Sequence, residues 1–92
     1  MNMAFQKLAD ISTAHLQDFT INGYMRDINC PITSYEYDYG RFVLVPDATL
    51  DIQNVPSDLI AVLEWALIND VQWIRFDCDA EVLPELPVYD WR

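Results

Sequence analysis

The feature that most constrains the fold is a segment of strict alternation from Thr33 to Tyr39, in which aromatic and acidic side chains take turns. Successive side chains of a β-strand point to opposite faces of its sheet. The segment is therefore expected to be a strand with three tyrosines on one face and two acids on the other. The tyrosines are Tyr35, Tyr37 and Tyr39, and the acids are Glu36 and Asp38.

The next segment, Arg41 to Val45, is apolar at consecutive positions from Phe42 onward. Such a run is typical of a central strand that is covered on both faces. Gly40 lies between the two strands, where it marks either a tight turn or a bulge in one long strand. Pro46 ends the second strand because it lacks a backbone donor.

The clearest helix of the chain is expected from Ser57 to about Asn69. Ser57 can cap this helix, and Asp58 lies in the first turn, where the helix dipole favours a negative charge. The apolar stripe recurs at helical spacing. Its members are Leu59, Val62, Leu63, Ala66 and Leu67. Trp65 and Ile68 fall outside the centre of the stripe, so the C-terminal tail or another molecule is expected to cover this helix on a second side.

The remaining elements are shorter. A strand is expected within 5–11, followed by a helix from near Ala14 that ends between Ile21 and Arg26, with Ser12 or Thr13 as its cap. Strands are also expected at 73–77 and 81–83, while Pro84 and Pro87 keep the tail out of regular helix. The order β-α-β-β-α-β-β predicts one α+β domain over 1–92, with two helices on one face of a mainly antiparallel sheet of four to five strands.

Acidic residues dominate the charge. The 92 residues hold 15 Asp and Glu against five Lys and Arg, for a net charge of −10. From Phe42 to Trp91 there are ten acidic residues, and Arg75 is the only cation. This surface would repel the phosphates of nucleic acid, so a basic protein is the expected partner. The 52% hydrophobic content is enough for a folded core and argues against disorder.

The two cysteines, Cys30 and Cys78, have no CxxC spacing, and no secretory leader is recognised. Both thiols are therefore expected to be reduced, in a cytoplasmic protein, with a disulfide as the alternative. No apolar run approaches the roughly 20 residues that span a bilayer. The absence of a basic segment also disfavours binding to an anionic membrane surface.

Several phrases together resemble a known family. They are Ile11 to Leu16, Tyr37 to Val43, Trp73 to Asp77 and Leu86 to Trp91. This combination is similar to the DUF5983-like group, small bacterial proteins of unknown function that are frequent on plasmids and integrated elements. The resemblance implies no known reaction. It implies a mobile-element setting, where small acidic proteins often act against host restriction or CRISPR machinery, a step that rests on analogy.

His15 is the only histidine, and Ser12 and Thr13 precede it. A nucleophile and base could be built from these residues. The chain has neither a Gly-x-Ser-x-Gly elbow nor an oxyanion loop, and a Ser or Thr at a helix start is more often a cap. A structural or partner-contacting His15 is therefore the favoured interpretation.

Asp77, Asp79 and Glu81 alternate around Cys78 and could hold Ca²⁺ or Mg²⁺. The segment does not fit a calcium-binding loop, because the required glycine and closing glutamate are missing. A zinc site with His15 would need two more ligands in a recognised spacing. An acidic turn at the surface is the favoured interpretation, and neither a metal nor a cofactor is expected.

The aromatic residues offer binding surfaces. The tyrosine face could stack on bases, but acids stand where a nucleic-acid reader would carry Lys or Arg. Packing of this face beneath the helices is favoured over an exposed patch for a protein partner. In the C-terminal tail, Tyr89 and Trp91 are expected to pack back on the sheet, with a homodimer contact as the alternative. We expect Trp65 or Trp91 to lie partly in a contact between chains.

The leading hypothesis is a non-enzymatic inhibitor, of anti-CRISPR or anti-restriction type, whose carboxylates occupy a basic groove as a nucleic-acid decoy. Two acidic rows would carry the mimicry. They are Glu36 with Asp38, and Asp77 with Asp79 and Glu81. The alternative is a partner-binding or homodimeric module that uses its Tyr and Trp patches without mimicry. A small enzyme or metal protein is the third hypothesis.

Overall fold

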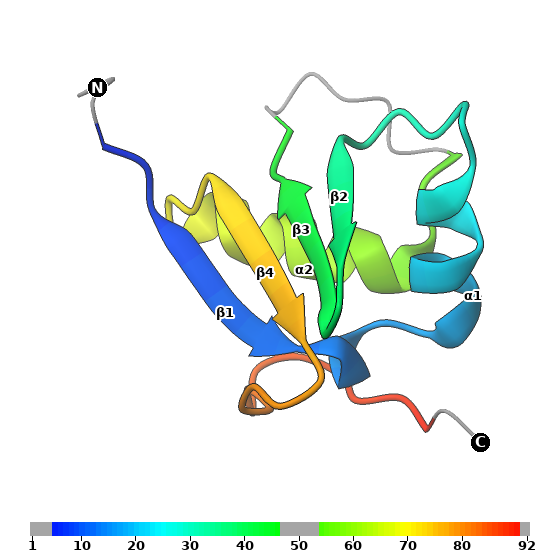
Figure 1. The fold of residues 1–92 in the computed structure, drawn as a ribbon. Coiled ribbons are helices and arrows are strands. Elements are labelled where there is room, and N and C mark those ends of the chain that lie inside the picture. Colours follow the sequence, from blue (N-terminus) through cyan, green and yellow to red (C-terminus); the bar gives the residue numbers. More distant parts are fainter. Residues whose placement is uncertain (1–4, 47–53, 91–92) are drawn as a thin grey trace.

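The computed structural model describes residues 5–46 and 54–90 as a sheet with helices on one side (Figure 1). Four strands, β1 (Leu8–Ser12), β2 (Ser34–Tyr37), β3 (Gly40–Leu44) and β4 (Trp73–Asp77), form one sheet in the order β1-β4-β3-β2. β1 and β4 run parallel, and the other neighbours are antiparallel. Helix α2 (Ser57–Ile68) lies across one face. The predicted α+β fold with a mainly antiparallel sheet is confirmed.

The segment after β1 differs from the single helix expected from Ala14. It consists of the 3-10 turn η1 (Thr13–His15), the short helix α1 (Asp18–Asn22) and a second 3-10 turn η2 (Tyr24–Arg26). Leu16 and Gln17 are extended between the first two, which interrupts the helical hydrogen bonds. The expected cap at Ser12 is present, because its hydroxyl accepts from the Ala14 amide at 3.0 Å.

Gly40 belongs to a tight hairpin rather than a bulge. It pairs with Tyr37, and Asp38 and Tyr39 form the turn between β2 and β3. A Cβ atom at Gly40 would lie only 1.8 Å from the carbonyl oxygen of Phe76 on β4. No side chain fits there, so β3 and β4 can approach only because this position is a glycine.

The core lies between the sheet and α2. The sheet contributes four side chains to it, Ile11, Val43, Ile74 and Phe76, and each is almost completely buried. The helix contributes four members of the predicted stripe, Leu59, Val62, Leu63 and Ala66. Leu67, expected as the fifth member, is exposed. Burial of these apolar side chains is the main stabilising contribution to the fold.

One buried carboxylate, that of Asp58, joins two helices beside this core. Asp58 is only 4% exposed, and its carboxylate accepts from the Gln17 amide at 2.8 Å and from the Thr20 hydroxyl at 2.9 Å. Ser57 was expected to cap α2, but Pro56 holds the cap position and no side chain caps the helix. Asp58 instead joins the first turn of α2 to the start of α1.

The C-terminal segment is not a strand. Residues 81–83 were expected to pair with the sheet, but they make only a single backbone bond to β1, from the Ser12 amide to the Glu81 carbonyl at 3.2 Å. Pro84 follows directly and cannot donate to a ladder. The described part of the tail does lie against the domain, since Leu86 is buried in the core and the Tyr89 amide donates to the Ala14 carbonyl of η1 at 2.8 Å.

Within the described residues, no helix is long and apolar enough to cross a membrane.

Candidate functional site: the open face of the sheet

Within residues 5–46 and 54–90, no helix covers the face of the sheet opposite α2 (Figure 1). Side chains alternate along each strand, so the residues between the core positions all point to this side. They are Leu8 and Asp10 of β1, Tyr35 and Tyr37 of β2, Phe42 and Leu44 of β3, and Trp73, Arg75 and Asp77 of β4. We call this surface the open face.

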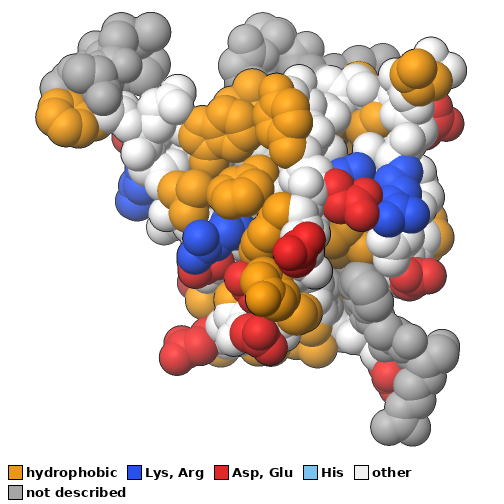
Figure 2. All heavy atoms as spheres, in the orientation of Figure 1, with side chains coloured by type: hydrophobic (Ala, Val, Ile, Leu, Met, Phe, Trp, Pro, Cys, Tyr) orange, Lys and Arg blue, Asp and Glu red, His pale blue; other side chains and the backbone are white. Residues whose placement is uncertain are grey.

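Aromatic rings form two contact groups on the open face. Tyr35 and Trp73 have ring centroids 6.4 Å apart, and Tyr37 lies 5.0 Å from Phe42 and 6.2 Å from Tyr39 of the hairpin turn. Tyr35 is 59% exposed and Tyr39 57%. Figure 2 views this face and shows hydrophobic side chains gathered over its middle. Packing of the tyrosines beneath the helices was therefore the wrong prediction, and the exposed patch is what the structure has.

The prediction that β3 is covered on both faces is also wrong for this chain. β3 is central, with β4 on one side and β2 on the other. Its helix-side residue Val43 is buried, whereas Phe42 and Leu44 remain partly exposed on the open face. β3 thus carries apolar side chains on both of its faces. Within the described residues, only the face toward α2 is buried.

An ion pair borders the rings on the β1 side. The Arg75 guanidinium donates to both Asp10 carboxylate oxygens, with Nε at 3.0 Å from Oδ1. The hydrogen bond from Arg75 lowers the pKa of Asp10 below its usual value. The two charges largely cancel, so the pair adds little net charge to the open face.

A hydrogen bond fixes the ring of Tyr37. Its hydroxyl donates to Asp77 Oδ2 at 3.0 Å across the neighbouring strand. Burial, helped by this bond and by the negative charge of Asp77, raises the pKa of Tyr37 to about 12. The phenol therefore stays protonated at any physiological pH.

The structure does not assemble the two expected acidic rows. Glu36 points to the helix side, where Arg26 donates to both of its carboxylate oxygens at 3.1 and 2.8 Å and lowers its pKa. Asp38 lies in the hairpin turn, not in the strand. Asp77 ends β4, while Asp79 and Glu81 follow in irregular backbone. The first row is interrupted by an ion pair, and the second does not run along a strand.

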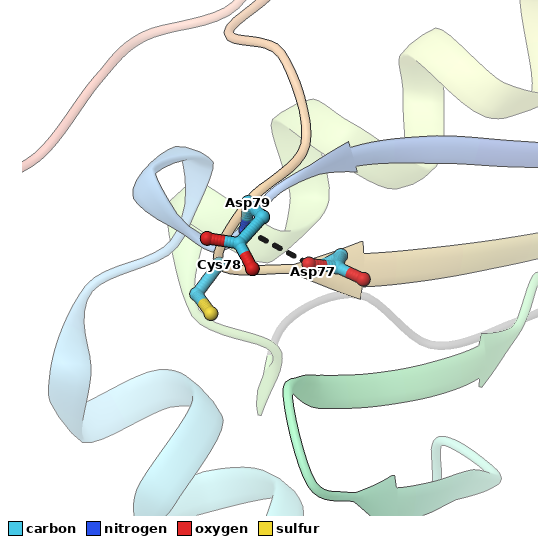
Figure 3. A group of neighbouring side chains, drawn as sticks. All are labelled: Asp77, Cys78 and Asp79. Atoms are coloured by element: carbon cyan, nitrogen blue, oxygen red, sulfur yellow. Dashed lines mark hydrogen bonds between the residues drawn. The ribbon is translucent and has the colours of Figure 1, made fainter.

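The side chain of Asp77, at the end of β4, lies near those of Cys78 and Asp79 in the turn that follows (Figure 3). One ligand atom from each can be found within 4.8 Å of the others. Both Asp77 oxygens already accept hydrogen bonds, Oδ2 from Tyr37 and Oδ1 from the Asp79 amide at 2.8 Å. Asp77 thus closes the turn, as aspartates commonly do. The set also mixes a soft thiol with hard carboxylates, which suit different metals.

His15 holds the tail rather than facing a cleft. It is 1% exposed, and its Nε2 lies 2.9 Å from the Leu83 amide while Nδ1 lies 2.7 Å from the Pro87 carbonyl. An amide can only donate and a carbonyl can only accept, so the proton sits on Nδ1 and Nε2 accepts. Both ring nitrogens are thus occupied by backbone groups of the tail, which supports the structural interpretation of His15.

Two further predicted residues, Trp65 and Tyr89, contact the tail and η1 rather than the rings of the open face. Trp65 of α2 is half-buried, and its indole donates to Glu85 Oε2 of the tail at 3.3 Å. The tail is thus what borders the second side of α2. Tyr89 is held to η1 through the hydrogen bond of its amide to the Ala14 carbonyl, and Trp91 lies outside the described residues. Both cysteines are free, with Cys30 half-buried and Cys78 exposed.

Phe42, Leu44 and Trp73 are members of the open face that were not named as site residues. Their signal was present in the sequence, because each is a large apolar residue next to a core position in a strand. Phe42 and Leu44 were predicted to be buried within the chain, and Trp73 was placed on the face of Arg75 and Asp77 without a role, since a sequence does not show which faces of a sheet the other elements cover.

Residues 8–91 match the model of a family of unknown function, the DUF5983 C-terminal domain. The chain belongs to the DUF5983 family. The match covers all four strands and both α-helices, so the whole fold described above is the family's domain. Neither a curated protein nor a solved structure matches the chain. The DUF5983 assignment agrees with the resemblance seen in the sequence and brings no activity with it.

Proposed function

We propose that the protein is a non-enzymatic binding module that attaches to a basic partner protein through the open face. The observation that carries this proposal is the uncovered aromatic group on β2, β3 and β4. Large exposed apolar patches on small proteins usually mark interaction sites, and Tyr and Trp are enriched among residues that dominate binding energy.

Charge supports a basic partner. The chain has a net charge of −10, and acidic side chains lie along the lower margin of the open face in Figure 2. Asp38 and Asp79 border the tyrosine end of the patch and have no ion-pair partner among the described residues. A partner with apolar side chains flanked by Lys or Arg would satisfy both the rings and these carboxylates.

A second copy of the chain fits this surface less well. Two copies would bring two charges of −10 together and would place the same acidic margin on both sides of the contact. Light scattering is expected to show a monomer at low ionic strength. A dimer that Tyr35→Ala dissociates would replace the basic partner with the homodimer alternative.

The proposal can be tested by placing a photo-crosslinking phenylalanine analogue at Tyr35 in the full chain. The matched control is the same analogue at Leu67, which is exposed on α2 at the opposite side of the sheet. A protein crosslinked from position 35 and not from 67 would then be purified and its affinity measured. Tyr35→Ala should weaken binding at least 10-fold, and Leu67→Ala should leave it unchanged. Equal effects of the two variants would reject the open face.

The salt dependence of the affinity distinguishes binding through the aromatic open face from binding by mimicry of nucleic-acid phosphates. In a mobile-element setting the basic partner could be a host defence nuclease, and the carboxylates would then stand in for phosphates. Mimicry predicts a steep fall in affinity with salt, because many charge contacts are screened. Asp38→Lys should then slow association far more than Glu64→Lys, an equal charge change on α2. Weak salt dependence with a strong effect of Tyr35→Ala would favour the aromatic face without mimicry.

A further inference from the structure

Arg41 of β3 is a buried cation without enough acceptors. It points to the helix side of the sheet and is only 7% exposed. In register it lies between Glu36 of β2 and Phe76 of β4. A guanidinium carries five N–H donors, and a buried one is stable only when they are paired.

The natural partner of Arg41 is taken by another arginine. Arg26 binds both carboxylate oxygens of Glu36, which leaves the Arg41 Nη2 atom 4.0 Å from Glu36 Oε1. Nη2 reaches only the Met25 carbonyl, at 3.4 Å. Within the described part of the chain, Nε and Nη1 of Arg41 are buried and have no hydrogen-bond partner. Two guanidinium groups thus share one carboxylate.

A hollow of about 270 Å³ lies beside this arginine, at the hairpin end of the sheet. Its lining combines polar and aromatic groups from three parts of the chain. Among them are Thr13, Asn22, Tyr37, Asp38, Tyr39 and Arg41. Asp38 is exposed in the turn, and its carboxylate has no hydrogen bond or ion pair within 5–46 and 54–90.

The charged side chains around the hollow disfavour ligands that carry a single charge of either sign. A simple anion would be repelled by Asp38 and by the net charge of −10, and a simple cation would be repelled by Arg41. Arg26 takes both oxygens of Glu36, which leaves Arg41 with one long contact to that carboxylate and two nitrogens without an acceptor, while Asp38 beside the same hollow has no cation partner. The complementary ligand therefore carries one group of each sign.

We propose that this hollow binds a small zwitterion of the α-amino-acid type, with its carboxylate at the Arg41 guanidinium and its ammonium at Asp38. The unpaired guanidinium nitrogens are already shielded from water, so little hydration is lost when a carboxylate reaches them. Side chains that shield them must shift to admit the ligand. The hollow shares Tyr37, Asp38 and Tyr39 with the tyrosine end of the open face, but the inference rests on Arg41 and does not depend on the partner contact.

The test is an NMR titration of the isotope-labelled full chain with L-alanine. Two matched probes each lack one charge: propionate has no ammonium, and ethylammonium has no carboxylate. L-Alanine should give saturable shifts at the amides of Thr13 and of residues 38–41, and either matched probe should bind at least 10-fold more weakly. No saturation by L-alanine at 50 mM (a concentration on the order of ten times a millimolar dissociation constant), or equal binding of propionate, would overturn the proposal.

Substitutions test whether Arg41 binds the carboxylate of the ligand and Asp38 its ammonium group. Arg41→Lys and Asp38→Asn should each weaken L-alanine at least 10-fold, while Asp79→Asn on the neighbouring turn should leave its affinity unchanged. Asp38 is exposed, so Asp38→Asn keeps the test valid even if Arg41→Lys does not fold. Binding of L-alanine that survives Asp38→Asn would show that the ammonium is not recognised and would overturn the proposal.

Discussion

The two faces of the sheet are built from the same strands but differ in how far their side chains are buried. On the helix side Val43, Ile74 and Phe76 are fully buried beneath α2, whereas on the open face Tyr35 is mostly exposed and Phe42 and Trp73 are partly so. Both faces are apolar, although a sheet with one face in water normally carries polar residues there. The difference teaches that composition alone does not show which face is the core. Burial depends on which face the helices cover.

The largest effect should come from matched truncations on the two faces. Phe76→Ala on the helix side should cost about 3–5 kcal/mol of unfolding free energy, because it leaves a cavity in a closed core. Phe42→Ala, the same truncation on the open face, should cost much less, because water fills the space. Urea denaturation of both variants measures the difference. Equal costs would mean that the open face is as closed as the core.

A second effect of similar origin concerns Asp58, on the covered side. Asp58→Ala leaves the Gln17 amide and the Thr20 hydroxyl without their acceptor, so we expect a loss of about 2–4 kcal/mol. Glu64→Ala, which removes an exposed carboxylate of the same helix, should change stability by no more than about 0.5 kcal/mol. If both variants unfold at the same denaturant concentration, the link between α1 and α2 contributes nothing.

Alkaline titration examines the open face itself. Tyr37 has its pKa raised to about 12 in the folded protein, against about 10 for an unfolded chain. Its contribution to stability is therefore complete below about pH 10 and is lost as the pH rises through about 12. Ultraviolet absorbance should show one phenol that ionises last, and this step should disappear in Tyr37→Phe. Its persistence in that variant would assign the raised pKa to another tyrosine.

The smallest effect is expected for the ion pair at the border of the open face. Asp10 has a lowered pKa, so its contribution is present above about pH 4 and is lost as the pH falls further. Asp10→Asn should cost at most about 1 kcal/mol at neutral pH, since exposed ion pairs are weak. The cost should shrink further in 1 M salt, which thermal unfolding can measure. A loss well above this value would show that Arg75 depends on Asp10 for more than charge.

Much of the fold could be predicted from the sequence. The period of two in Thr33 to Tyr39 and the stripe of α2 located β2 and the main helix, because those patterns report which residues share a face. The predictions of short elements were wrong. The helix expected from Ala14 is interrupted at Leu16 and Gln17, and residues 81–83 do not form a strand of the sheet. Backbone hydrogen bonds to distant residues decide such segments, and neighbouring residues in the sequence do not reveal them.

The candidate site could be predicted only in part. Tyr35 and Tyr37 were recognised as sharing a face, but the identity of that face depended on where α2 and the tail come to rest. Arg41 was predicted only as the start of a strand and not as a site residue. Its guanidinium lacks acceptors only because Arg26 of η2 binds Glu36 in the folded protein. Competition between two cations for one acid is a property of the folded arrangement.

The close approach of Gly40 to Phe76 has a consequence for recognition. With no room for a Cβ atom, the hairpin end is locked against β4, and the Tyr37 hydroxyl is tied to Asp77 on the same strand. The rings near this end are thus preorganised, and a partner would not need to freeze them on docking. Rigid aromatic anchors lower the entropic cost of association, so complexes formed here should owe their lifetime to surface fit more than to folding upon binding.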